Sequence, residues 1–237
     1  MATVWCALDR TLDRNVAIKL LSGPYASDEL AGRRFTREAR AAARLSGHAN
    51  VVTIYDVSQA DPEDDTASGR PFIVMERLLG GSVADALRAS PIGPDLALSW
   101  LHQAAAAIDY AHARGVIHRD IKPSNLLLDG TRRLHVADFG IAQVAAEDTL
   151  TATGQLLGTV AYLAPEVALG QPATEASDRY ALAVAAFELL TWSRPFRASH
   201  VTPDPGARSP SGLARSGAGE VIQLARQHIE APPPRAS

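Results

Sequence analysis

The chain has 237 residues, of which 46% are hydrophobic and 21% are charged, and its formal net charge is −3. This composition is typical of a soluble globular protein with one large domain or two small lobes. The slight acidity argues against a basic nucleic-acid-binding surface, so we expect no nucleic-acid partner.

The cysteine content and the hydropathy pattern indicate the compartment. The single cysteine, Cys6, excludes an internal disulfide framework, and we interpret it as a free, buried thiol in a reducing environment. The opening MATVWCALDR does not resemble a signal peptide, and the longest apolar stretch, YALAVAAFELL, is interrupted by Glu188. We therefore expect a cytoplasmic protein without a membrane segment in this chain.

The first elements of the chain predict strands around one helix. Residues 14–21, RNVAIKLL, alternate in part, which places Ala17 and Lys19 on the same face of a strand. Residues 28–45 are rich in helix formers and predict a helix with a solvated face.

Two further strands are expected before the helical part of the chain. Residues 50–57 and 70–78 are rich in β-branched and aromatic side chains, which favour strands. The polar, acidic segment 58–70 between them contains Pro and Gly and predicts an exposed hairpin loop.

The rest of the chain is mostly helical in pattern. Small and apolar residues recur at spacings of three and four between residues 94 and 115, and Gly115 is suited to end that helix. This stripe consists of Ala97, Leu101, Ala104, Ile108 and Ala111. Short strands are expected at 126–128 and 134–138, and a helix that is apolar on nearly all sides at 177–192.

Charged residues gather in an unusual place, between the helix at 94–115 and the first short strand. A hairpin of the two short strands would bring Asn125 and Asp138 to one end, and carboxylate and amide oxygens suit Mg²⁺. Asp120 lies close by as a possible proton acceptor, and Lys122 can neutralise charge on a transferred phosphoryl group. This set of groups is what phosphoryl transfer requires.

The same stretch, HRDIKPSN, resembles the catalytic loop of protein kinases. Further motifs of that family follow in the expected order: VAIK with Lys19, a helix glutamate at Glu38, DFG from Asp138, APE at 164–166, and an aspartate at Asp178 that anchors the catalytic loop. The resemblance covers residues 1 to about 196 and, more loosely, a short helix near 220–230. Six motifs in this order make the resemblance specific.

The resemblance implies roles for the charged residues. Asp120 is expected to be the catalytic base, with Lys122 and Asn125 beside it. Asn125 and Asp138 are expected to hold Mg²⁺, and Lys19 to contact the phosphates of ATP.

The supporting charges have expected partners as well. Glu38 would form an ion pair with Lys19, and Arg119 would receive a phosphate on the activation segment. The candidate autophosphorylation sites are Thr151 and Thr153. His118 is expected to be structural rather than a proton shuttle.

The resemblance also assigns a nucleotide-binding surface. Backbone groups of Glu76 and Leu78 would bond the adenine edge, with Met75 as the gatekeeper. The apolar walls of the adenine site would be Val4, Ala17, Met75, Leu78 and Leu127.

The family implies a two-lobed α+β fold. The expected divisions are a small β-rich N-lobe at 1–78, a larger helical C-lobe at 79–196, a flexible Pro/Gly/Ser/Arg-rich insertion at 197–219, and a short helix with a tail at 220–237. Relative to the family pattern, the first strand, most of the glycine-rich loop and the last helices are missing. On this basis we expect weakened nucleotide affinity, and no arginine partner for Glu166.

The finer resemblance is to bacterial, receptor-type serine/threonine kinases, particularly actinobacterial ones, because Lys122 and Pro123 follow Asp120 and GTVAYLAPE ends the activation segment. The implied activity is transfer of the γ-phosphoryl group of ATP to Ser or Thr hydroxyls of protein substrates, including its own activation segment, with a kinase dimer as a further possibility. The alternative is a catalytically impaired fragment or pseudokinase-like docking scaffold. A small-molecule phosphotransferase is disfavoured, because the APE segment and the Lys-Pro pair are both present.

Overall fold

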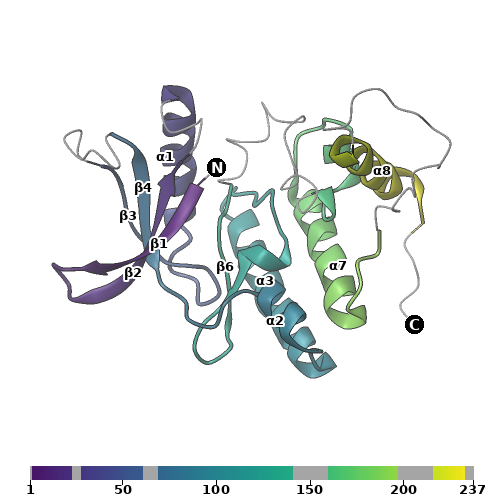
Figure 1. The fold of residues 1–237 in the computed structure, drawn as a ribbon, viewed down its shortest axis with the longest axis horizontal. Helices are drawn as coiled ribbons and strands as arrows, with labels where there is room; N and C mark the ends of the chain where they lie inside the picture. Colours follow the sequence, from purple (N-terminus) through teal and green to yellow (C-terminus); the bar gives the residue numbers. More distant parts are fainter. Residues whose placement is uncertain (1, 23–27, 61–68, 141–159, 197–215, 233–237) are drawn as a thin grey trace.

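The computed structural model describes residues 2–22, 28–60, 69–140, 160–196 and 216–232. A sheet with one helix lies at one end of the molecule, and a group of helices lies at the other (Figure 1). This division agrees with the expected two-lobed α+β fold.

The sheet is antiparallel, with its four strands in the order β1-β2-β4-β3. The strands are β1 (Ala2–Asp9), β2 (Arg14–Leu21), β3 (Ile54–Gln59) and β4 (Pro71–Glu76). β3 begins later than the predicted strand at 50–57. Cys6 lies on the edge strand β1 and is exposed, so the prediction of a buried thiol was wrong. An edge strand is flanked by a neighbour on one side only, which leaves its side chains less covered.

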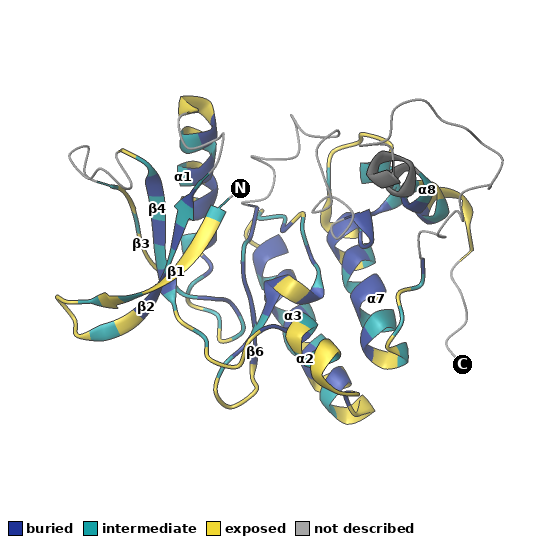
Figure 2. Cartoon of the chain, in the orientation of Figure 1, coloured by how far each residue is buried: buried dark blue, intermediate teal, exposed yellow. Residues whose placement is uncertain are grey.

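Helix α1 (Glu29–Ala43) packs against the sheet and begins where the side chain of Asp28 caps it, accepting a 2.9 Å hydrogen bond from the Leu30 amide. Phe35 and Ala39 on its inner face are fully buried, as the amphipathic pattern predicts. Its other faces include exposed residues (Figure 2).

The helical lobe is built around α3 (Pro94–His112) and α7 (Glu175–Thr191), which lie side by side (Figure 1). Most of the predicted stripe on α3 is buried, and Trp100, outside that stripe, is fully buried as well. α7 differs from the prediction, because it buries one face only and leaves Leu190 exposed. The shorter helices are α2 (Val83–Ala89) and α6 (Pro165–Ala168).

Helix α8 (Ser216–Glu230) begins before the predicted start at residue 220, within the segment expected to be a flexible insertion. It packs against α6 through a face that buries Leu224 and His228. The Tyr180 hydroxyl lies 2.8 Å from Nδ1 of His228. Residues 197–215 of the predicted insertion, and 61–68 of the acidic loop, lie outside the described residues.

The sheet and the helical lobe are joined after β4 by a segment that contains Gly80. A Cβ at this position would lie 2.5 Å from the Asp129 carbonyl oxygen and 2.7 Å from that of Leu128, so only glycine fits. The Gly80 amide donates to the Leu128 oxygen at 2.8 Å, and the Leu128 amide donates to the Gly81 oxygen at 2.8 Å. These contacts hold the segment between the two lobes against Leu128, in the strand that follows the charged loop.

Two short strands, β5 (Leu126–Leu128) and β6 (Leu134–Val136), form the predicted hairpin, with a 3-10 turn over Pro123–Asn125 before it. Leu126 pairs with Val136 in its antiparallel register. Within the described part of the chain, no helix is both long enough and apolar enough to cross a bilayer.

Candidate active site

The charged loop is held from below by Asp178 on α7, which is only 1% exposed. Its carboxylate accepts hydrogen bonds of 2.8 Å from the backbone amides of His118 and Arg119. These bonds fix the loop backbone at Arg119, where φ is +70°, a left-handed conformation that costs a non-glycine residue about 1–3 kcal/mol. The predicted anchoring role of Asp178 is confirmed.

His112, at the end of α3, is a member of this network that the sequence analysis missed. Its Nε2 atom lies 2.8 Å from the Asp178 carboxylate, and its side chain is buried. The sequence held a signal, because His112 follows Ile108 by one helical turn and extends a buried stripe with a polar residue. A polar residue on such a stripe requires a buried partner.

His118 connects the charged loop to the segment that carries Asp138. Its ring is fully buried, Nε2 lies 2.8 Å from the Ala137 carbonyl oxygen, and Nδ1 accepts a 3.2 Å hydrogen bond from the Asp120 amide. Burial lowers the pKa of His118, although the carboxylates of Asp178 and Asp120 oppose this effect. A neutral ring that donates from Nε2 suits both contacts, so His118 is structural, as expected.

The carboxylate of Asp120 is positioned by two neighbours on the same loop. One of its oxygens lies 2.8 Å from the Lys122 ammonium and accepts a 2.9 Å hydrogen bond from Asn125 Nδ2. The same Asn125 amide nitrogen donates to the Asp120 carbonyl oxygen at 2.8 Å. The structure thus brings the three predicted catalytic residues together, and Asn125 Oδ1 is not used in these bonds.

The β5–β6 hairpin places Asn125 and Asp138 at the same end, as predicted, because they flank the Leu126–Val136 pair. The Ala137 amide donates to the Asn125 carbonyl oxygen at 2.9 Å and closes the ladder at that end. Asp138 itself has a φ of +65°, the second strained backbone position of the site.

The far end of the hairpin is tied to α3 and to the segment before β3. The Trp100 indole nitrogen donates to the Arg132 carbonyl oxygen at 2.8 Å, and Gln103 Oε1 accepts from the Leu134 amide at 2.8 Å. Asn50 donates to the Leu134 carbonyl oxygen at 2.8 Å. Side chains outside the predicted site therefore hold the strands that carry its oxygen ligands.

Lys19 reaches from β2 to the end of this hairpin. Its ammonium lies 2.7 Å from an Asp138 carboxylate oxygen, and its side chain is 10% exposed. Burial would raise the pKa of Asp138, but the charge of Lys19 and its hydrogen bond outweigh that effect and hold the pKa below its usual value. Asp138 is therefore ionised and is ready to act as a ligand for a cation.

The ion pair predicted between Glu38 and Lys19 is not formed among the described residues, because Lys19 pairs with Asp138 instead. Glu38 is buried on the inner face of α1, and its carboxylate lies 4.0 Å from the guanidinium of Arg119. A Cβ on Gly140 would lie 4.0 Å from Glu38 Cγ, so α1 contacts the segment after Asp138. Lys19 therefore pairs with Asp138 in place of Glu38, and Glu38 lies near Arg119.

The donor set fits a divalent cation that also binds phosphate. Asn125 Oδ1 and the Asp138 carboxylate are hard oxygen ligands, and the described residues contain no group of three or more His, Cys, Asp and Glu side chains that could hold an ion alone. Mg²⁺ usually takes one or two protein oxygens and completes its shell with water and substrate phosphates. The residues present therefore suit a divalent cation.

The residues predicted to surround adenine lie mostly in one apolar cluster. Ala17 pairs with Met75 across β2 and β4, and both belong to the cluster beneath the sheet, with Leu78 and Leu127 packed at its edge. Val4 differs, because it is exposed on β1 and faces Lys19 in the strand register. The Glu76 backbone amide is already bonded to the Thr53 carbonyl oxygen at 2.8 Å. A cavity of about 20 Å³ lies behind Met75, lined in part by Asp138.

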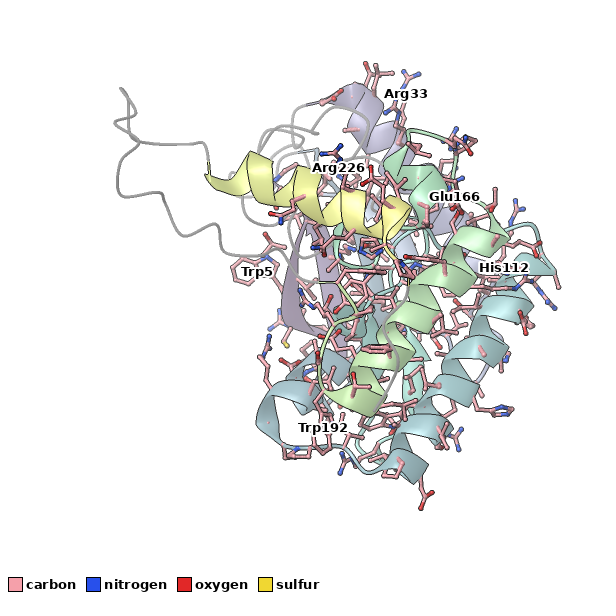
Figure 3. The ribbon with its side chains drawn as sticks, turned by 90° about the vertical axis from the view of Figure 1, so that its right-hand side faces the viewer. Trp5, Arg33, His112, Glu166, Trp192 and Arg226 are labelled. Atoms are coloured by element: carbon pink, nitrogen blue, oxygen red, sulfur yellow. The ribbon has the colours of Figure 1, made fainter. Side chains whose placement is uncertain are left out.

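Glu166 has a partner that the sequence analysis did not foresee. The Ser177 hydroxyl on α7 donates to its carboxylate at 2.6 Å, so a hydroxyl rather than the arginine of the family pattern bonds to it among the described residues. Figure 3 shows Glu166 and His112 on the helical side of the molecule. Thr151 and Thr153 lie outside the described residues.

Comparisons with known proteins agree with the family resemblance of the sequence motifs. Residues 1–207 match the family model described as the protein kinase domain. The chain is 45% identical to the serine/threonine-protein kinase PrkC of Bacillus subtilis over 83% of this chain and 29% of that protein. It is 38% identical to PknJ and 37% identical to PknA, serine/threonine-protein kinases of Mycobacterium tuberculosis, over 100% and 99% of this chain and 36% and 49% of those proteins. The chain thus spans about half the length of these relatives or less.

Proposed function

Since the chain belongs to the protein kinase family, whose members use ATP and a divalent metal, we propose that it transfers the γ-phosphoryl group of ATP to Ser or Thr hydroxyls of proteins. The observation that supports this proposal best is the Asp120 carboxylate, positioned by Lys122 and Asn125 at 2.8 and 2.9 Å. This arrangement suits a group that orients a hydroxyl and accepts its proton.

In the proposed reaction, the substrate hydroxyl oxygen forms a bond to the γ-phosphorus, and the bond from that phosphorus to the bridging oxygen of ATP breaks. The hydroxyl proton passes to the carboxylate of Asp120, and ADP leaves. Lys122, 2.8 Å from Asp120, balances negative charge that develops on the transferred group.

Asn125 Oδ1 and Asp138 would hold Mg²⁺, which would neutralise charge on the ATP phosphates when bound. Lys19 would contact these phosphates. In the present structure its ammonium is 2.7 Å from Asp138, so phosphate binding requires it to release that carboxylate. Glu38, on α1, would then become its partner.

Three finer proposals follow from the same function. Ala17, Met75, Leu78 and Leu127 would enclose the adenine ring with Val4, and the backbones of Glu76 and Leu78 would bond its edge. Arg119, whose side chain is 35% exposed, would bind a phosphate on Thr151 or Thr153. Because the reaction consumes ATP, we place this domain in the cytoplasm, and a kinase dimer stays a prediction.

The test is transfer of labelled phosphate from Mg-ATP to a general Ser/Thr acceptor protein and to the chain itself, with Asp120→Asn as the matched variant. We expect the variant to lose about 10²–10⁴-fold in rate, the usual contribution of a positioned base. Nucleotide binding is measured separately by calorimetry. Equal signals from the two proteins would refute the proposal, and nucleotide binding without transfer would favour the docking scaffold.

A further inference from the structure

The outward face of α1 carries a row of arginines. Arg33, Arg37, Arg40 and Arg44 recur at spacings of four, three and four, which places them on one side of the helix, and all four are exposed. Figure 3 labels Arg33 near the outer end of α1. We call these four residues the arginine row.

The row forms one wall of a groove rather than a convex surface. A groove of about 720 Å³ runs between α1 and the ends of β3 and β4, and the four arginines line it together with Thr36, Gln59 and Pro71. This volume is within the range of binding clefts, about 300–1,000 Å³. Thr36 and Gln59 add side chains that can donate and accept hydrogen bonds.

The described part of the chain offers few carboxylates to balance this positive charge. Among the described residues, the row has a single ion pair, Arg33 with Glu29 at 2.6 Å, and both side chains are highly exposed. Asp28, the other acidic residue that lines the groove, caps the start of α1. In a chain with a net charge of −3, the remaining three arginines concentrate positive charge in one cleft.

We propose that this groove docks an acidic, extended segment of a protein partner. Arg37 and Arg44 are two turns apart, about 10 Å along the helix axis. Successive arginines of the row are about 4.5–6 Å apart along the axis. In an extended chain, side chains on the same side recur about every 7 Å, so acidic residues at alternate positions can each lie within reach of a long arginine side chain. The planar guanidinium binds carboxylates through two parallel hydrogen bonds, which favours this class of ligand.

Docking here contacts the helix that also carries Glu38, on its opposite, buried face. The site is separate from the charged loop, and its binding does not depend on ATP or on phosphoryl transfer. It can therefore be tested whether or not the proposed function holds.

The experiment is fluorescence polarisation of a labelled peptide of alternating Glu and Ala against the full chain, with a Gln/Ala peptide for comparison. We expect the Glu peptide to bind and the Gln peptide to bind at least about tenfold more weakly, a difference of about 1.4 kcal/mol. The double variant Arg37→Glu/Arg40→Glu should lose at least about tenfold in affinity. A milder Arg37→Gln/Arg40→Gln variant, with its fold checked by circular dichroism, should show the same direction.

The matched control is Arg10→Glu/Arg226→Glu, which changes the net charge equally at two exposed arginines outside the groove. It should keep the affinity within about twofold. An equal loss in both double variants would overturn the proposal, because net charge alone would then explain binding. No affinity for the Glu peptide would overturn it as well, and so would tighter, row-dependent binding of duplex DNA or anionic vesicles.

Discussion

On the helical side of the site, the buried carboxylate of Asp178 lies 2.8 Å from three nitrogens, those of the His118 and Arg119 amides and of the His112 ring. On the sheet side, Lys19 is held by one ion pair with Asp138. The charged loop therefore has its geometry imposed by three buried contacts, whereas the sheet side, where we propose that the nucleotide binds, depends on a single charge pair. This asymmetry suits the proposed reaction, which needs a fixed proton acceptor, Asp120, and a cation that can move, Lys19.

The largest expected effect comes from breaking the fixed side. Asp178→Ala leaves three buried donors without an acceptor, and we expect the free energy of unfolding to fall by about 3–5 kcal/mol. Urea denaturation measures this, with Asp109→Ala as control, because Asp109 is 70% exposed on α3. A loss below about 1 kcal/mol would contradict the idea that the loop is built on Asp178.

The sheet side should respond more strongly in activity than in stability. For Lys19→Met we expect phosphoryl transfer to fall about 10²–10³-fold, because a preorganised cation is lost. Methionine fills a similar volume, so we expect the unfolding free energy to fall only by the amount that the rise in the pKa of Asp138 implies. The pKa of Asp138 should rise when the charge of Lys19 is removed, which carbon NMR of the carboxylate can detect. Arg14→Met, on the same strand, is the control, and an unchanged rate would remove Lys19 from the site.

The connection between the two sides can be tested at Gly80. Gly80→Ala forces a Cβ to within 2.5 Å of the Asp129 carbonyl oxygen, so we expect a loss of about 1–3 kcal/mol in unfolding free energy. Gly130→Ala is the matched control, because nothing lies within 4 Å of the added atom there. Equal stabilities of the two variants would show that the segment around Gly80 adapts.

The smallest expected effect concerns the outer packing of the helical lobe. Burial lowers the pKa of His228 from 6.5 to about 4, so the unfolded chain binds a proton first as the pH falls. The stability that comes from a neutral His228 is complete at neutral pH and is lost between about pH 6.5 and 4. Between pH 7.5 and 5.5 we expect a loss of about 1 kcal/mol in unfolding free energy that His228→Asn lacks. His102→Gln, at an exposed histidine, should retain the wild-type slope.

Most of the candidate site could be predicted from the sequence, because each of its motifs lies within a single loop or element. Asp120, Lys122 and Asn125 share one loop, and the hairpin that brings Asp138 to Asn125 is short. The contacts that the sequence could not predict join distant parts of the chain. No local sequence pattern shows whether Lys19 pairs with Asp138 or with Glu38, because both side chains end in a carboxylate.

The errors in the predicted burial of side chains also arise because burial depends on contacts between distant parts of the chain. Leu190 and Cys6 are apolar or weakly polar residues in apolar surroundings, and their exposure depends on where the neighbouring elements stop. Ser177 as partner of Glu166 was missed because it requires the relative placement of α6 and α7. Periodicity describes one element at a time and carries no information on such placements.

The hairpin of β5 and β6 has only three residues in each strand, and Asn125 and Asp138 stand just outside its last pair. Sliding one strand by a single position would turn every side chain of that strand to the other face of the hairpin, and would so change the direction of Asn125 relative to Asp138. Trp100, Gln103 and Asn50 hold the opposite end against such a slip. Substitutions at these supporting residues can therefore misalign the chemistry without touching any reacting group.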